Sequence, residues 1–211
     1  MTNQTKQTQF IDYDVLAGVE DLVNRLEKRG INFTVFRKWM KDNKVIAAGS
    51  YILQTLIKEE WSESDFDVYV LGDSKKDLEK CANNYEPPPN SKLLKEVSTY
   101  QYQTSDIIRV TEWAVGDEKN PLIVQIMSIN PFEYDDLKKF IDLYDLDFCK
   151  VIFDGDKVEV MYPYSVRTKI SIYNRLYSGD NHVDIERKLR WNNRKKTRTL
   201  KYEKRGFTIF G

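Results

Sequence analysis

The feature that most constrains the fold is a glycine turn between a short strand and a helix, followed by a second strand that opens on two aspartates. Residues 45–48 form an apolar run that ends in Gly49, and Ser50 stands in a capping position before a helical repeat of apolar residues. Residues 65–71 alternate in polarity and are rich in β-branched side chains, which predicts a strand. We therefore expect the glycine turn and the two aspartates on adjacent elements.

The remaining pattern predicts an α+β chain. Helices are expected at residues 12–26, 36–40, 74–85 and 131–143, and from residue 164 onward. Strands are expected at 100–115, 122–129, 148–153 and 157–161, with hairpin loops at 116–121 and 154–156, an exposed loop at 87–91 and a docked strand or tail at 205–210. We predict a mixed or mostly antiparallel central sheet flanked by helices. Residues 1–163 would form the core, and residues 164–211 a basic helical segment that packs on it as one wall of a cleft.

Charge is unevenly distributed along the chain. The 211 residues include 33 basic and 33 acidic side chains, and this net charge of zero argues against a general polyanion binder. The C-terminal end is nevertheless strongly basic, and from Arg187 onward Glu203 is the only acidic residue. The basic residues of this stretch are Arg187, Lys188, Arg190, Arg194, Lys195, Lys196, Arg198, Lys201, Lys204 and Arg205. This end is a local cationic patch.

Composition and the rare residue types narrow the class of protein. The polar start lacks the apolar core of a signal peptide and no run is long enough to span a bilayer, so we expect a cytoplasmic protein without a membrane partner. Cys81 and Cys149 lie far apart and suit neither a disulfide framework nor a zinc site, and His182 is the only histidine. A histidine metal cluster or a histidine-dependent hydrolase triad is therefore not expected.

Asp65 and Asp67 have the spacing of a metal site. At positions i and i+2 of one strand their side chains project from the same face, so both carboxylates can ligate one divalent cation, Mg²⁺ or Mn²⁺. Gly49 and Ser50 have the features of a phosphate site. A glycine lets backbone N–H groups approach an anion, the serine adds a hydroxyl donor, and the helix dipole favours negative charge.

The motif Ala48-Gly49-Ser50, then a helix, then Asp65-Phe66-Asp67-Val68 resembles the Gly-Ser and Asp-x-Asp signature of the DNA polymerase β-type nucleotidyltransferase superfamily. The resemblance covers residues 45–71 well and the strand at 122–129 more loosely. The end at 204–209 is similar to the Lys-Gly-Phe-Thr-Ile segment that closes the palm in family X polymerases. The fold that this implies is nucleotidyltransferase-like.

The resemblance also implies an activity: transfer of NMP from an NTP to an acceptor hydroxyl with Mg²⁺ or Mn²⁺ as cofactor. Asp65 and Asp67 would be catalytic metal ligands, and Gly49 and Ser50 would bind the outer phosphates. Many relatives carry arginine where this chain has other residues after Ser50. A basic side chain after residue 163 is frequent in the superfamily, so Lys169 is expected to bind the nucleotide, with Arg167 as a further donor.

A departure concerns the third carboxylate, which the superfamily places on a later central strand. By resemblance that strand is 122–127, and its acid position holds Gln125. A neutral amide cannot act as the base or ligand that completes the acceptor-side metal site, so either another acid substitutes or catalysis is weakened. Asp145 is the first candidate for this catalytic acid, and Glu112, on the partner strand, is the second.

Two alternatives to an active transferase remain open. The first is a catalytically degenerate protein of the same fold that binds a nucleotide or a nucleic acid without turnover, which Gln125 favours. The second is a nucleic-acid-binding protein whose aspartates are structural, because Trp191 and Tyr202 interleave with the basic run as aromatic side chains do in nucleic-acid grooves. For the active enzyme, the basic segment favours RNA or another phosphorylated acceptor.

Overall fold

The computed structural model describes residues 11–62, 64–72, 85–97, 106–173 and 185–211, and centres on a seven-stranded sheet. The strands are β1 (Ile46–Ala48), β2 (Phe66–Leu71), β3 (Ser91–Val97), β4 (Ile107–Val115), β5 (Leu122–Ile129), β6 (Val151–Phe153) and β7 (Val158–Val160). Their order across the sheet is β3-β4-β5-β2-β1-β6-β7. β2 and β5 run parallel, whereas the other neighbouring pairs are antiparallel. The expected mixed, mostly antiparallel sheet is confirmed.

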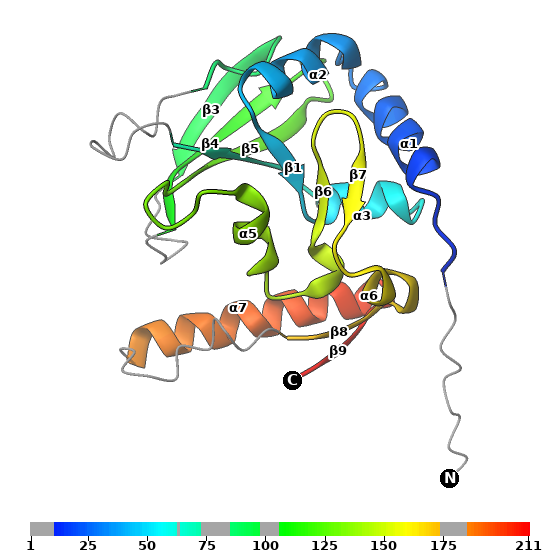
Figure 1. Cartoon of the computed structure of the whole chain (residues 1–211), viewed down its shortest axis with the longest axis vertical. Coiled ribbons are helices and arrows are strands. Elements are labelled where there is room, and N and C mark those ends of the chain that lie inside the picture. Colours follow the sequence, from blue (N-terminus) through cyan, green and yellow to red (C-terminus); the bar gives the residue numbers. More distant parts are fainter. Residues whose placement is uncertain (1–10, 63, 73–84, 98–105, 174–184) are drawn as a thin grey trace.

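Helices cover the sheet on both faces (Figure 1). They are α1 (Val15–Glu27), α2 (Phe33–Asp42), α3 (Ser50–Leu56), α5 (Leu137–Asp142), the 3-10 helix η2 (Asp147–Cys149), α6 (Pro163–Thr168) and α7 (Ile185–Lys204). One face of β2 buries Phe66 in a core shared with Phe36 of α2 and Leu53 of α3. The opposite face buries Tyr69 against Phe140 of α5. Alternation along β2 therefore places Asp67 on the α5 face, beside Tyr69.

The basic helix α7 is attached to the core by aromatic rings and by a small second sheet. The Tyr202 and Phe207 rings lie 4.9 and 4.2 Å from the ring of Phe148. β8 (Ile170–Ile172), which precedes α7, pairs in parallel with β9 (Thr208–Phe210), which follows it. Figure 1 shows α7 and this strand pair running along one side of the molecule, next to α5 and α6. The C-terminal end of α7 is thus held against the core by aromatic contacts and by the strand pair that flanks the helix.

Most of the expected elements are present, with several differences. The helix expected at 131–143 is confined to Leu137–Asp142, and the strand expected at 148–153 begins at Val151, after the 3-10 helix η2. The expected helix at 74–85 falls almost wholly outside the described residues. The loop expected at 87–91 is less exposed than predicted, because Pro88 is buried and Ser91 already begins β3. The continuous helix expected from residue 164 is interrupted, because Ile170–Ile172 forms a strand that pairs with Thr208–Phe210.

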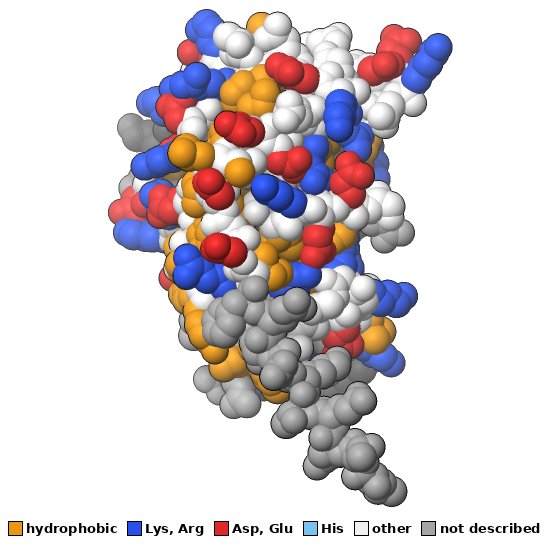
Figure 2. Space-filling view, turned by 90° about the vertical axis from the view of Figure 1, so that its right-hand side faces the viewer, with side chains coloured by type: hydrophobic (Ala, Val, Ile, Leu, Met, Phe, Trp, Pro, Cys, Tyr) orange, Lys and Arg blue, Asp and Glu red, His pale blue; other side chains and the backbone are white. Residues whose placement is uncertain are grey.

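The surface mixes the two signs of charge. On the face drawn in Figure 2, basic and acidic side chains are interspersed and neither sign dominates. In the part of the chain that the structure covers, no helix combines the length and apolar character needed to cross a membrane.

Candidate active site

Gly49 brings the start of α3 against the side chain of Asp67. Ala48 at the end of β1 is the register partner of Asp67 on β2, so the chain turns away from the sheet directly beside this aspartate. Gly49 has φ 90° and ψ −150°, a conformation that is nearly confined to glycine. A Cβ at this position would lie 3.3 Å from Asp67 Oδ2. The predicted proximity is confirmed, although Gly49 rather than Ser50 is the N-cap residue of α3.

Replacing Gly49 with alanine is expected to lower the free energy of unfolding by about 1–3 kcal/mol, the cost of holding a non-glycine residue in this region. Gly155 is a matched control, because its φ is 97° but the nearest neighbours of an added Cβ would lie at 3.7 Å. Urea denaturation should show a loss of stability in both variants. Mn²⁺ affinity should fall only in Gly49→Ala, because only that methyl group crowds Asp67; equal affinities would contradict this account.

Burial and mutual repulsion act on the two aspartates. Asp65 is exposed just before β2, and Asp67 is partly buried within it. Desolvation, followed by the charge of Asp65, raises the pKa of Asp67 to about 7, against the opposing charges of α7. Desolvation, followed by the charge of Glu112, raises the pKa of Asp65. Such paired carboxylates are suited to a cation, which relieves their repulsion.

A row of polar side chains crosses the sheet from Asp67. Gln125 on β5 is the parallel register partner of Asp67, and Glu112 on β4 is the antiparallel partner of Gln125. The Gln125 amide donates from Nε2 to Glu112 Oε1 at 3.0 Å. Lys95 on β3 continues the row, with its Nζ 3.0 Å from Glu112 Oε2. The residue that sequence comparison placed at the third acid position is therefore adjacent to Asp67, and the nearest acid along the row is Glu112.

A basic stripe at the C-terminal end of α7 faces the two aspartates. It consists of Arg194, Arg198 and Lys201 of α7 and of Arg205, which directly follows the helix; their spacings of four, three and four residues match the period of a helix. The charges of Arg198, Lys201 and Arg194 lower the pKa of Asp67. Burial, followed by the charges of Arg205 and Arg198, lowers the pKa of Lys201. The helix-period spacing within the basic run could have identified this stripe from the sequence.

Hydroxyl groups and a guanidinium gather beside the start of α3. Ser50 Oγ lies 3.4 Å from Ser64 Oγ in a hydrogen bond, and Arg205 Nη2 lies 3.5 Å from the same Ser64 oxygen. The Arg205 guanidinium is stacked over the Trp61 ring at 4.1 Å. Ser64 and Arg205 were missed by the sequence analysis, because their proximity depends on how α7 docks against the loop before β2.

Asp145 and Lys169 each form an ion pair, and Asp145 also accepts a hydrogen bond from a hydroxyl group. Asp145 Oδ2 lies 3.0 Å from Arg198 Nε and accepts a 2.6 Å hydrogen bond from the Tyr173 hydroxyl. Lys169 forms an ion pair with Glu59, and its ammonium lies 5.3 Å from the centre of the Phe207 ring. Arg167 lies over the ring of Tyr13, at 5.4 Å. The catalytic role of Asp145 and the nucleotide contacts of Lys169 and Arg167 remain predictions.

The donor set at Asp65 and Asp67 fits Mg²⁺ or Mn²⁺. Among the described residues, no group of three or more His, Cys, Asp or Glu side chains is arranged as a metal site. Mg²⁺ does not require one, because it is commonly bound by one or two carboxylates together with waters and substrate phosphates. Gly49 contributes space at Asp67 Oδ2 that a Cβ would restrict. The pair is thus suited to a cation that arrives with a phosphorylated substrate.

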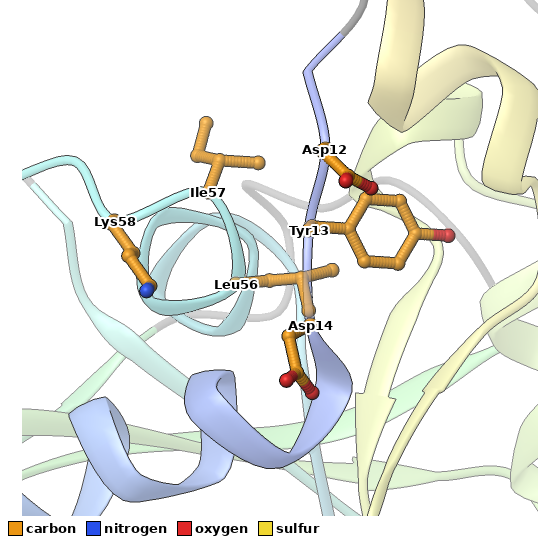
Figure 3. A pocket seen from close by; sticks show the side chains of 6 residues that line it. All are labelled: Asp12, Tyr13, Asp14, Leu56, Ile57 and Lys58. Atoms are coloured by element: carbon orange, nitrogen blue, oxygen red, sulfur yellow. The ribbon is translucent and has the colours of Figure 1, made fainter.

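A shallow pocket lies away from these side chains, at the other end of α3. Figure 3 shows it between the segment before α1 and the C-terminal end of α3. It is lined by Asp12, Tyr13, Asp14, Leu56, Ile57 and Lys58. Gly49 and Ser50 stand at the N-terminal end of the same helix, so this pocket is not part of the candidate active site.

Comparison with solved structures supports the fold assignment. The chain matches a CCA-adding enzyme in complex with CTP at 16% identity and a TM-score of 0.51, covering 89% of this chain and 41% of that one. A CCA-adding enzyme in complex with ATP matches at 16% identity and a TM-score of 0.51, covering 90% and 42%. The protein therefore has a nucleotidyltransferase fold and spans about two fifths of the length of these enzymes.

Comparison with protein sequences identifies the family. None of the curated proteins matches this chain. Residues 9–169, most of the chain, match the family described as Gabija anti-defense 2 family protein. The matched range includes the glycine turn, both aspartates and the row of Lys95, Glu112 and Gln125. The chain belongs to the Gabija anti-defense 2 family.

Proposed function

We propose that this protein is a metal-dependent nucleotidyltransferase, which transfers NMP from an NTP to an acceptor hydroxyl. The observation that carries the proposal is the position of the Gly49 turn directly beside the side chain of Asp67 within a nucleotidyltransferase fold. The glycine turn, the helix that follows it and the strand with two aspartates occur in the order that the superfamily uses. The proposal extends from the fold to the chemistry through these residues.

Asp65 and Asp67 would hold the Mg²⁺ or Mn²⁺ ion. When bound, such a metal supplies charge neutralisation at the phosphate and acidifies the attacking hydroxyl. The protein's own contribution is to fix the two carboxylates on one strand face, next to a turn that only glycine allows. Because Asp67 lies partly buried within β2, its position is the better fixed of the two.

The outer phosphates of the NTP are assigned to Ser50, Ser64 and Arg205, with Lys201 as a neighbouring positive charge. These side chains gather at the start of α3, where the chain lacks the arginines that relatives carry after the serine. Guanidinium groups bind phosphate oxygens in two-pronged fashion, and stacking on Trp61 restricts how the Arg205 group can move. Lys169 remains a proposed nucleotide contact that would exchange Glu59 for a phosphate.

Asp145 enters the proposed mechanism through Arg198. Its carboxylate holds the guanidinium from one side, while the charge of Arg198 acts on Asp67. Asp145 is therefore assigned the task of fixing a positive charge near the reacting phosphate. As a base for the acceptor hydroxyl it would first have to leave Arg198 and Tyr173.

The acceptor is proposed to be RNA or another phosphorylated molecule. The basic stripe supports this choice, because it extends from the half-buried Arg205 to the exposed Arg194. Phosphate groups of an acceptor could follow the same side chains away from the aspartates. The family description names Gabija, so we propose to look for the acceptor in cells that contain Gabija.

The test is to incubate the purified protein with each α-³²P-labelled NTP, with Mg²⁺ or Mn²⁺, and with extracts of cells that contain or lack Gabija. RNase and protease treatment of the products separates RNA from protein acceptors. Label that requires metal and is lost in an Asp65→Asn, Asp67→Asn double variant supports the proposal. If all four nucleotides and both metals give no label in either extract, the transferase assignment is wrong.

A degenerate binding protein of the same fold is the second candidate. The observation that favours it is Gln125 at the register position beside Asp67, where an acid was expected. A metal-dependent increase in thermal stability on adding NTP, without label transfer to any acceptor, would support this candidate. Binding that requires nucleic acid but no nucleotide, with steep salt dependence, would instead indicate the basic stripe as the functional element.

A further inference from the structure

We propose that Glu59 is a positioning residue of the phosphate site: it holds the Trp61 indole on which the Arg205 guanidinium lies, and so prepares Arg205 to bind the triphosphate. The inference rests on the proposed function, because it concerns the same phosphate site. It gives a role to the segment 57–61 after α3, which carries neither of the two aspartates.

The segment after α3 is fixed by Gln54, a buried residue of that helix. The Gln54 side-chain oxygen accepts a 2.8 Å hydrogen bond from the Trp61 backbone N–H, and the Gln54 carbonyl accepts one of 2.9 Å from the N–H of Glu59. The Glu59 carbonyl in turn accepts a 2.8 Å hydrogen bond from Arg25 Nη2. Because these bonds constrain the backbone, the side chains of Glu59 and Trp61 start from fixed positions.

The Glu59 carboxylate has a partner on each oxygen. Oε2 accepts a 2.9 Å hydrogen bond from Trp61 Nε1, and Oε1 forms the ion pair with Lys169. A hydrogen bond to a charged acceptor is stronger than one to a neutral group, so it restricts rotation of the indole. The rings of Tyr202 and Phe207 meet the indole edge-on, at 6.2 and 6.1 Å between ring centres. The orientation of the Trp61 ring is therefore set both by its N–H group and by packing.

The oriented indole determines where the Arg205 guanidinium lies. The guanidinium carbon is 4.1 Å from the centre of the Trp61 ring, and Nη2 lies 3.5 Å from Ser64 Oγ. Ser64 Oγ is in turn 3.4 Å from Ser50 Oγ, at the start of α3. A guanidinium stacked on an aromatic ring presents its N–H groups in one fixed plane, the geometry in which it binds phosphate oxygens. Glu59 thus acts on the phosphate site through Trp61, without touching the phosphate itself.

The ion pair with Lys169 is a second route from Glu59 to the same site, because Lys169 is itself a proposed nucleotide contact. Loss of the carboxylate could therefore change phosphate binding even if the indole played no part. A double-mutant cycle separates the two routes. Trp61→Phe keeps an aromatic ring but removes the N–H group, so it breaks the route through the indole and leaves the ion pair in place.

The experiment measures the dissociation constant of inorganic tripolyphosphate, in the presence of Mg²⁺, by calorimetry on the full chain. Trp61→Phe should weaken binding about three- to tenfold, the effect of losing one hydrogen bond that positions a binding group. Glu59→Met keeps the length of the side chain and removes the acceptor. Its effect on the dissociation constant should be about three- to tenfold larger in the parent than in the Trp61→Phe protein.

Two controls separate positioning from general damage. Glu60→Met makes the same substitution at the next residue, whose side chain is exposed, and should leave tripolyphosphate binding unchanged. The Mn²⁺ affinity, measured without phosphate, should be the same in the parent and in every variant, because Asp65 and Asp67 are left in place. A fall in Mn²⁺ affinity in Glu59→Met would mean that Glu59 supports the whole site rather than the phosphate clamp, and would overturn the inference.

The cycle distinguishes failure of the inference from failure of the proposed function. Equal effects of Glu59→Met in the parent and in Trp61→Phe overturn the inference and leave the phosphate site in place. No tripolyphosphate binding by the parent protein removes the phosphate site and with it the proposed function. If Trp61→Phe does not fold, the cycle is made with Arg205→Lys, which keeps the charge but not the planar group on the indole, and additive effects would again overturn the inference.

Discussion

Replacing Asp67 with asparagine is expected to reduce NMP transfer by about 10³-fold, a loss of about 4 kcal/mol of transition-state stabilisation. The substitution keeps the size of the side chain but removes the charge that would hold the metal at the reacting phosphate. Asp67 is the aspartate that lies within β2, next to Gly49, whereas Asp65 is exposed before the strand. Asp65→Asn should therefore cost less than Asp67→Asn.

The measurement is the single-turnover rate with the NTP and acceptor that the labelling experiment identifies. Asp135→Asn serves as the control for loss of a surface carboxylate, because this side chain is exposed and forms an ion pair with Lys139 of α5. Transfer by Asp67→Asn at more than a tenth of the parent rate would show that this aspartate does not hold an essential metal.

The second large effect concerns the stability of the metal-free protein as a function of pH. In the folded state the pKa of Asp67 is raised from 3.8 to about 7, first by desolvation and then by Asp65. Between these values the folded protein keeps a proton that the unfolded chain releases. The free energy of unfolding should therefore fall as the pH rises from about 4 to 7, and Asp67 should cause no further change above 7. The full effect is at most about 4 kcal/mol.

Asp67→Asn isolates this contribution, because asparagine does not titrate. Urea denaturation in the presence of a chelator should give equal stabilities for variant and parent near pH 4. The variant should become progressively more stable than the parent up to pH 7, and the difference should then stay constant. A difference that does not depend on pH would mean that Asp67 is not the group responsible. Adding Mg²⁺ should stabilise only the parent, and most strongly above pH 7, where the carboxylate is ionised.

The proximity of Gly49 to Asp67 could be predicted from the sequence because both positions are fixed by local rules. A glycine turn between strand and helix and a strand with period two determine where each side chain points, once the two strands pair. Gln125 lies beside Asp67 as the resemblance to the superfamily implied, because that resemblance placed the strand at 122–127 next to the strand of the aspartates. These parts of the site depend on strands that neighbour one another in the sheet.

The basic stripe could not be assigned to the site from local rules. Its position relative to Asp67 depends on the docking of α7, which is determined by the contacts of Tyr202 and Phe207 with Phe148, far away in the sequence. The same dependence hid the pairing of Asp145 with Arg198. Charge alone predicted a basic helix but not which residues face Asp67.

Two strands escaped the sequence analysis for different reasons. β3 contains two adjacent leucines between charged residues and does not alternate, because it is an edge strand with both leucines exposed. β8 has only three residues, too few for a period to be recognised, and it depends on pairing with β9. Because β3 was not predicted, Lys95 was not placed next to Glu112, and their ion pair at the end of the row of polar side chains was not foreseen.

The pairing of β8 with β9 constrains the segment that carries the basic stripe at both of its ends. β8 precedes α7 and β9 follows it, and the two strands are joined by three register pairs. The contacts of Tyr202 and Phe207 with Phe148 also hold α7, so the strand pair is one of two attachments of the basic stripe. A change in the pairing of β8 with β9 would therefore act on Arg194, Arg198, Lys201 and Arg205 together, even though β8 and β9 contribute none of these four side chains themselves.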